Sequence, residues 1–155
     1  CHDSPLTWLN WEHAPWQDDL LAHVRRLIQL RRDNPALRPR RFARDAHVVP
    51  SASVIDWYDE NGETMSIERW TDPVHRTLQY DAASTPEEED PNRILLVVHG
   101  TESAVDVTLP TIDGVAGYVS LWSSVPDRPD TTEPVFAPGD VLTLPGTALH
   151  LFRMQ

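Results

Sequence analysis

The hydrophobic residues between Pro15 and Asn34 recur with the spacing of one helix face. The apolar positions are Trp16, Leu20, Val24, Leu27 and Ile28, with Leu21 and Leu30 widening the stripe. Pro15 suits a first helical turn, and Pro35 disfavours a helical conformation in the residue before it, so we predict one long helix that ends there. A helix with so broad an apolar face must pack on something, either the following domain or a portion of a longer protein.

After Phe42 the pattern changes to short apolar segments separated by Pro, Gly, Asn and Asp, which is typical of antiparallel β structure. The expected strands are 53–58, 64–67, 94–99, 105–109, 118–122, 141–144 and 149–152. The sequence therefore predicts a mainly β fold: an antiparallel β-sandwich preceded by one long α-helix.

Three of these segments carry more specific expectations. Asn61-Gly62 lies between the first two segments and predicts a hairpin that joins them. Residues 94–98 are apolar without interruption, which favours a central strand buried on both faces, whereas 105–109 alternates and should have one solvent face. Residues 81–92 and 123–138 are rich in acids or proline, and we expect them to be irregular surface excursions.

Composition and charge exclude several classes of protein. The 155 residues carry a formal net charge of -11, and residues 51–155 hold 18 acids against 5 arginines, so a polyanion such as nucleic acid would be repelled. No apolar run approaches the ~20 residues that span a bilayer, so no membrane partner is expected. The single cysteine, Cys1, rules out an internal disulfide framework, and we expect a cytoplasmic protein. Because the chain begins without an initiator Met, we expect a piece of something longer.

The motifs of common catalytic sites are missing from this chain. It has no glycine-rich phosphate loop, no Gly-x-Ser-x-Gly elbow and no His-Glu-x-x-His helix. The seven histidines have no helical ligand spacing, so we expect no metal and no cofactor, and we interpret His99 and His150 as structural. Asp56 with Asp59 or Glu60 could form a carboxylate pair, but these acids flank a turn, and we expect them to be solvated.

Six tryptophans are the one compositional excess with a functional meaning, because indole rings stack on sugar rings. Trp16 lies on the apolar face of the predicted helix, and Trp57 and Trp122 lie in predicted strands, so we expect these three in a core. Trp8 and Trp11 precede the helix, and the pattern leaves both core packing and a sugar-facing role open.

Four segments carry a resemblance to a known family. The first 11 residues read Cys-His-Asp-Ser-Pro-Leu-Thr-Trp-Leu-Asn-Trp, with several rare residues in the order found in the family. Residues 24–38 resemble a last barrel helix, 54–70 the start of a C-terminal domain, and 144–153 its closing strands. Together they resemble the bacterial glycogen debranching enzymes of the isoamylase type, within the α-amylase superfamily.

The resemblance implies a parent enzyme that hydrolyses α-1,6-glucosidic branch linkages in glycogen or limit dextrin by a retaining mechanism, with two carboxyl groups about 5 Å apart. In that family the catalytic carboxylates come from barrel strands that precede the segment matched by residues 1–11. We therefore expect no catalytic residue in this chain. Residues 1–38 would be the end of the catalytic barrel and 39–155 the C-terminal β-sandwich, with Trp8, Trp11 and Asp3 as substrate-binding candidates.

The partners implied are a branched α-glucan, bound through the parent enzyme, and the missing catalytic barrel. Two other classes stay open. A stand-alone carbohydrate-binding module would expose strand tryptophans, for which Trp70 and Trp122 are the candidates. An interaction domain with no sugar contact would fit the acidic sandwich, and burial of Trp16, Leu20 and Val24 inside this chain would argue against it.

Overall fold

In this computed structural model, the structure describes residues 2–39, 55–84, 90–125 and 135–155. The chain divides into two compact units, Cys1–Asp33 and Asn34–Gln155, and each is described by itself. Predicted features at residues 53 and 54, and within the excursions at 85–89 and 126–134, lie outside the described residues.

The first unit contains the long helix α1 (Pro15–Asp33), as the apolar spacing predicts. Its start is fixed by the side chain of Gln17, whose Oε1 accepts a hydrogen bond of 2.7 Å from the backbone N–H of Ala14, one arm of a capping box. The basic residues of the last turn, Arg31 and Arg32, suit the negative end of the helix dipole. The helix therefore begins and ends where local chemistry favours it.

The first unit by itself does not bury the apolar face of α1. Trp16 is 64% exposed, and Leu20, Val24 and Ile28 are exposed as well. The first unit therefore gives Trp16 no core of its own, because it is a single helix with an extended segment and offers no second layer to cover the ring.

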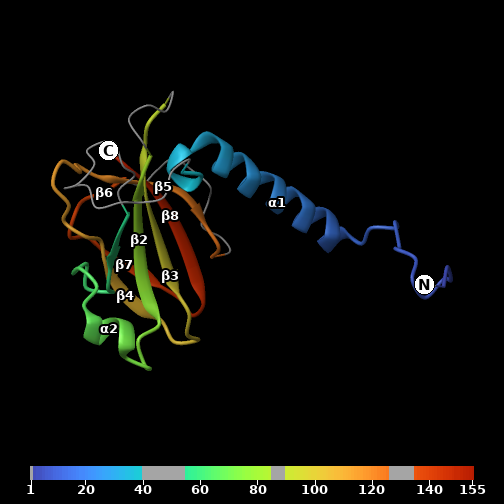
Figure 1. Cartoon of the computed structure of the whole chain (residues 1–155), viewed down its shortest axis with the longest axis horizontal. Coiled ribbons are helices and arrows are strands. Elements are labelled where there is room, and N and C mark those ends of the chain that lie inside the picture. Colours follow the sequence, from blue (N-terminus) through green and yellow to red (C-terminus); the bar gives the residue numbers. More distant parts are fainter. Residues whose placement is uncertain (1, 40–54, 85–89, 126–134) are drawn as a thin grey trace. The chain divides into compact units, whose positions relative to one another are not determined.

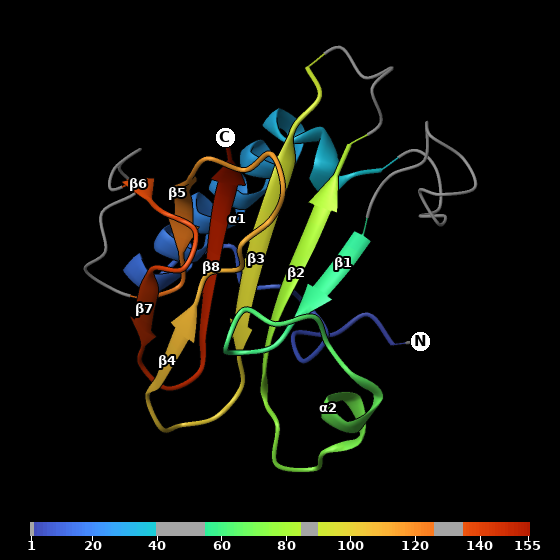
Figure 2. The same cartoon turned by 90° about the vertical axis from the view of Figure 1, so that its left-hand side faces the viewer.

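The second unit is built from two antiparallel sheets (Figures 1 and 2). In spatial order, the large sheet contains β1 (Ile55–Tyr58), β2 (Thr77–Ala83), β3 (Arg93–His99), β8 (Ala148–Met154), β5 (Tyr118–Ser123) and β6 (Val135–Phe136). The small sheet pairs β4 (Val105–Thr108) with β7 (Val141–Leu144). The predicted antiparallel β-sandwich is confirmed, and the described residues form no closed barrel.

The core lies between the two sheets. Its buried members are Leu95, Val97, Val107, Leu109, Tyr118, Leu142, Leu144, Ala148, Phe152 and Met154. Phe152 is at the centre, with edge-on contacts to Tyr118 at 6.1 Å and Phe136 at 5.6 Å between ring centroids. β3 lies between β2 and β8, so the prediction of a central strand is confirmed, but Leu96 and Val98 are only half-buried, so the strand is not buried fully on both faces. β4 alternates as expected between exposed Asp106 and buried Val107.

A short 3-10 helix, η1 (Pro35–Leu37), opens the second unit and contacts β2 and β3. The side chain of Asn92 fixes it, since Asn92 Oδ1 accepts from the N–H of Ala36 at 3.0 Å and Asn92 Nδ2 donates to Asn34 Oδ1 at 2.7 Å. Pro35 and Ala36 are buried as a result.

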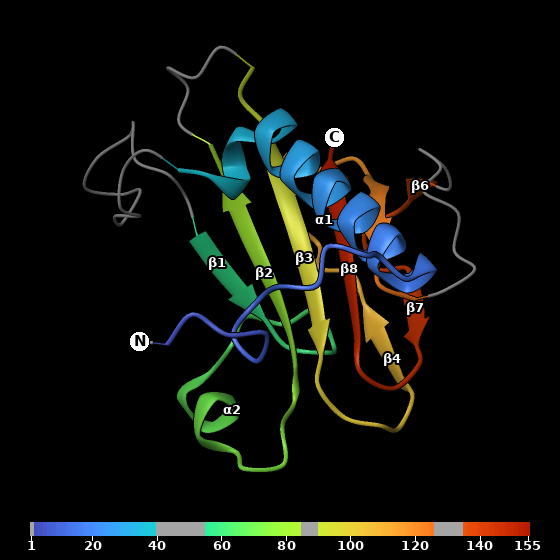
Figure 3. The same cartoon turned by 90° about the vertical axis from the view of Figure 1, so that its right-hand side faces the viewer.

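The predicted hairpin between 53–58 and 64–67 is wrong in its second strand. β1 pairs with β2, and only a single bridge joins Tyr58 to Thr64. The tight turn itself is real, with Gly62 at φ +77° and its N–H bonded to the carbonyl of Asp59 at 3.1 Å. Beyond it the chain forms a short helix, α2 (Ile67–Thr71), which lies past the end of β1 (Figure 3).

The sequence interpretation also missed strand β2. Its inward positions are Thr77, Gln79 and Asp81, all buried, so the segment lacks the apolar alternation that marks a strand. Gln79 Nε2 donates to the carbonyls of Asp59 and Thr108, each at 2.8 Å, which pairs its amide nitrogen inside the sandwich, while Oε1 has no hydrogen-bond partner among the described residues. Polar partners replace hydrophobic contacts along this strand.

The two strand histidines are structural, as predicted. His150 is buried, accepts or donates one hydrogen bond with Ser120 Oγ at 2.8 Å, and stacks on Phe152 with ring centroids 4.2 Å apart. His99 is also buried, and its two ring nitrogens contact Thr77 and Ser103.

Among the described residues, no helix has the length and hydropathy needed to cross a bilayer.

Candidate functional site

The segment before α1 contains the predicted substrate-binding residues, and it is organised by a local turn. The N–H of Thr7 donates to the carbonyl of Ser4 at 2.9 Å, and the Thr7 hydroxyl donates to the same carbonyl at 2.9 Å. This turn brings Asp3 and Trp8 together, so that the indole Nε1 of Trp8 donates to Asp3 Oδ1 at 2.5 Å. A charge-assisted hydrogen bond of this kind holds the ring by one edge.

Both tryptophans of the segment are open to solvent. Trp8 is 62% exposed despite its bond to Asp3, and Trp11 is 79% exposed. An indole whose edge is fixed while most of its surface is accessible can stack on the apolar face of a sugar ring. The geometry is compatible with the predicted role of Asp3, Trp8 and Trp11, and that role stays a prediction.

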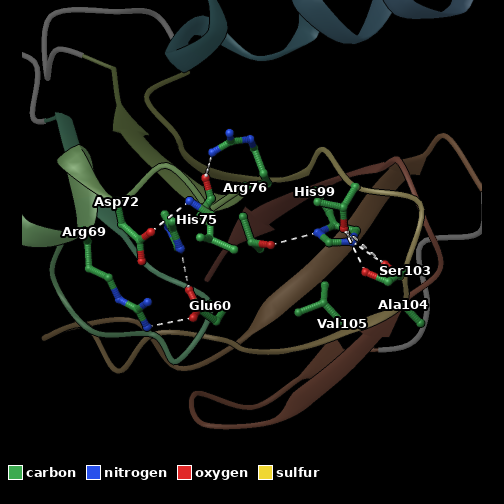
Figure 4. Close-up of a pocket in the computed structure, with 12 residues that line it drawn as sticks. Glu60, Arg69, Asp72, His75, Arg76, His99, Ser103, Ala104 and Val105 are labelled. Carbon is green, nitrogen blue, oxygen red and sulfur yellow. Dashed lines mark hydrogen bonds and ion pairs between the residues drawn. The ribbon is translucent and has the colours of Figure 1, made fainter.

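A second candidate is a pocket of about 340 Å³ in the second unit, which the sequence did not predict (Figure 4). It is formed where α2, the loop before β2, the end of β3 and the loop after β3 meet. Its polar lining includes Glu60, Arg69, Asp72, His75, Arg76, Thr77, His99, Thr101 and Ser103. The sequence singled out Glu60 and His99 for other reasons, but it did not group these residues, because the fold alone brings them together.

One side of the pocket is organised by Glu60. Arg69 Nη2 donates to Glu60 Oε1 at 2.7 Å, and His75 Nδ1 lies 3.1 Å from Glu60 Oε2, so the carboxylate joins the two side chains (Figure 4). The His75 side chain is only 8% exposed, and its Nε2 is buried without a hydrogen-bond partner among the described residues. A buried polar atom of this kind costs about 1–3 kcal/mol while it stays unpaired.

The other side of the pocket is organised by His99. Its Nε2 lies 2.6 Å from the carbonyl of Ser103, which can only accept, so Nε2 carries a hydrogen. Its Nδ1 lies 2.8 Å from Thr77 Oγ1, so a second hydrogen bond holds the ring from its other side. Thr101 Oγ1 lies 3.1 Å from both His99 Nε2 and Ser103 Oγ, so these two hydroxyls face the pocket in a fixed arrangement.

The described residues contain no group of three or more His, Cys, Asp or Glu side chains placed to hold a metal ion.

Asp59, expected to be solvated, is in fact buried. Its Oδ1 accepts from the backbone N–H groups of Asn61 and Glu63 at 2.8 and 3.1 Å, and its Oδ2 accepts from Arg69 Nε at 3.2 Å. This carboxylate shapes the turn and anchors Arg69 rather than facing a substrate.

Comparison with known proteins decides which family these features belong to. The chain is 34% identical to the glycogen debranching enzyme of Dickeya chrysanthemi over 110 residues, which cover 71% of this chain and 14% of that protein. It is 30% identical to the isoamylase of Pseudomonas amyloderamosa over 108 residues, covering 70% of this chain and 13% of that protein. The chain is a relative of the bacterial glycogen debranching enzymes of the isoamylase type.

The resemblance to glycogen debranching enzymes extends over nearly the whole chain. A glycogen operon protein GlgX homolog from Mycobacterium bovis is 28% identical over 158 residues, covering 95% of this chain and 20% of that protein. The chain therefore spans between 13% and 20% of the length of these three relatives. No family model matches it.

The remaining tryptophans bear on the alternatives to a debranching enzyme. Trp122 is only 8% exposed, as predicted for a core residue, and so offers no platform for sugar. Trp70 on α2 is 50% exposed and packs edge-on against half-buried Trp57, with ring centroids 5.5 Å apart. Of the two residues that a stand-alone carbohydrate-binding module would use, only Trp70 is accessible.

Proposed function

We propose that this chain is a non-catalytic part of a glycogen debranching enzyme, and that its parent hydrolyses α-1,6-glucosidic branch linkages in glycogen or limit dextrin. The observation that carries the proposal is the similarity to debranching enzymes and isoamylases, which covers at least 70% of the chain but at most 20% of each of the three relatives compared. The second unit of this chain is a mainly antiparallel β-sandwich, as expected for the C-terminal domain of such an enzyme.

In this proposal residues 1–38 are the end of the catalytic barrel and 39–155 form the C-terminal domain. The apolar stripe of α1 supports it, because Trp16, Leu20 and Ile28 are exposed and would be covered by neighbouring barrel elements in the parent. Burial of Trp16, Leu20 and Val24 inside this chain would have argued against the alternative of an interaction domain with no sugar contact.

The proposal also assigns a place to the segment before α1. Trp8, held by Asp3, and Trp11 edge the glucan cleft of the parent and stack on sugar rings there. Their exposure and the hydrogen bond between Trp8 and Asp3 support this assignment.

Two assays test the proposal. The purified chain is incubated with branched limit dextrin, and released reducing ends are measured; we expect none above the buffer control, and release above it contradicts the non-catalytic role. The coding region upstream of Cys1 is then sequenced. We expect acidic residues at the barrel-strand motifs, and their absence contradicts a debranching parent.

The cleft assignment is tested in the parent polypeptide with the variant W8A/W11A. Losing two stacking contacts should raise KM for branched glucan about fivefold or more while kcat changes little. The matched control is W70A, which removes another exposed tryptophan and should leave KM unchanged. An effect of W70A larger than that of W8A/W11A would instead favour a carbohydrate-binding module.

A further inference from the structure

The proposed role of covering a catalytic barrel does not explain the pocket formed by α2 and the loops next to β3. Its lining carries two positive side chains, Arg69 and Arg76, and two negative ones, Glu60 and Asp72, so its formal charge is balanced. A balanced lining disfavours both a free anion and a free cation. It suits a neutral ligand that both donates and accepts hydrogen bonds.

The arginines are already engaged with the protein, which argues further against an anion site. Arg69 donates to Asp59 and Glu60, and Arg76 Nη1 donates to the carbonyl of His75 at 2.6 Å. An anion would have to compete with a buried carboxylate for the first guanidinium. A hydroxyl group would not, since it can accept from a remaining N–H and donate to Glu60 or Asp72.

The side of the pocket that carries Thr101 and Ser103 also offers groups that can donate and accept hydrogen bonds. Hydrogen bonds to Thr77 and to the carbonyl of Ser103 hold the His99 ring between them. Thr101 and Ser103 then present hydroxyls that can still donate or accept toward the pocket. Val74, Ala104 and Val105 supply the apolar surface on which C–H groups of a sugar ring can rest.

His75 adds an unpaired atom to this lining. Its Nδ1 side faces Glu60, which leaves Nε2 as a buried atom with no hydrogen-bond partner among the described residues. A ligand hydroxyl that donates to Nε2 would remove the cost of leaving it unpaired. Since the atom has almost no accessible surface, binding requires a small shift of the pocket wall.

We propose that this pocket binds a neutral, polyhydroxylated ligand of one or two sugar units. Its volume of about 340 Å³ lies at the small end of the range for ligand pockets, which is about 300–1,000 Å³. The identification of the sugar as part of an α-glucan rests on the proposed function. The site would hold a glucan chain on the β-sandwich.

The test is a titration of the full chain with maltotriose, followed by the shifts of backbone amide signals in NMR spectra. We expect saturable shifts at residues 74–77 and 99–105. The double variant T101V/S103A removes two hydroxyls and should weaken maltotriose binding about fivefold or more. The matched control T143V removes an exposed hydroxyl on β7, outside the pocket, and should bind as the unsubstituted chain does.

Three outcomes overturn the proposal. Shifts confined to residues 2–14 would place the sugar on the tryptophan segment, and a complete absence of shifts would mean that the chain does not bind sugar in this pocket. Shifts of the pocket signals by inorganic phosphate but not by maltotriose would show an anion site. The NMR shifts are measured on the unsubstituted chain, so they test the proposal even if the variant T101V/S103A fails to fold. None of these outcomes affects the reducing-end and upstream-sequence tests of the proposed function.

Discussion

The buried ion pair between Asp81 on β2 and Arg93 on β3 gives the sharpest test of how the sandwich is stabilised. Asp81 is fully buried, and Arg93 donates to both of its carboxylate oxygens, through Nε to Oδ1 at 2.8 Å and through Nη2 to Oδ2. The Arg93 side chain is partly exposed. The two partners should therefore respond very differently to substitution.

The substitution Arg93→Ala leaves a carboxylate in the interior without a partner, which costs about 3–5 kcal/mol of the free energy of unfolding. Asp81→Asn should cost less, about 1–2 kcal/mol, because the guanidinium left behind can turn toward water. The matched control is Arg25→Ala on the exposed surface of α1, which we expect to change stability by less than about 0.5 kcal/mol.

The pH dependence gives an independent check on the same pair. Burial raises the pKa of Asp81 above its ordinary value, while hydrogen bonds from Arg93 oppose that rise. Without Arg93 the pKa rises further, so the folded state holds its proton at a pH where the unfolded chain has lost it. The free energy of unfolding of R93A therefore falls as pH increases from the unfolded pKa to the folded one.

Urea unfolding followed by near-ultraviolet circular dichroism, at about pH 5 and about pH 8, measures both effects. We expect the difference between the unsubstituted chain and R93A to be larger at the higher pH. Equal destabilisation by R93A and D81N, or a difference that shrinks as pH rises, would refute the argument that an unpaired buried carboxylate causes the loss.

Three smaller predictions follow from individual contacts. Gly146→Ala would drive a Cβ into the backbone of Glu102 and should cost about 1–3 kcal/mol in urea unfolding, whereas Gly100→Ala meets only ordinary contacts and should be nearly neutral. Tyr118→Phe leaves a buried carbonyl without its donor and should cost about 1–3 kcal/mol, with a near-neutral result contradicting that bond. Burial raises the pKa of Tyr58 to about 12, with nearby carboxylates adding to it, so stability should fall as pH rises from about 10 to about 12, and Y58F should reduce that loss.

The sequence predicted the elements in which hydrophobic residues recur with the regular spacing of one helix or strand. The helix ending before Pro35 and the central strand at 93–99 are both hydrophobic patterns that match the geometry of one element, and both are present. Strand β2 was missed for the opposite reason. Its inward residues Gln79 and Asp81 are buried only because Thr108 and Arg93 satisfy them from other strands, and no local pattern reports such partners.

The two candidate sites also differ in how far the sequence could predict them. The contact between Asp3 and Trp8 spans five residues of one turn, so a sequence motif could point to it. The pocket depends on α2, because Arg69 holds Glu60 in place next to His75. Residues 64–67 were interpreted as a strand although Ser66 could cap a helix, and in the structure its Oγ accepts from the N–H of Arg69 at 3.3 Å. Recognising Ser66 as a helix cap would have corrected the strand, whereas the pocket also needs His75 and His99, which only the fold brings next to α2.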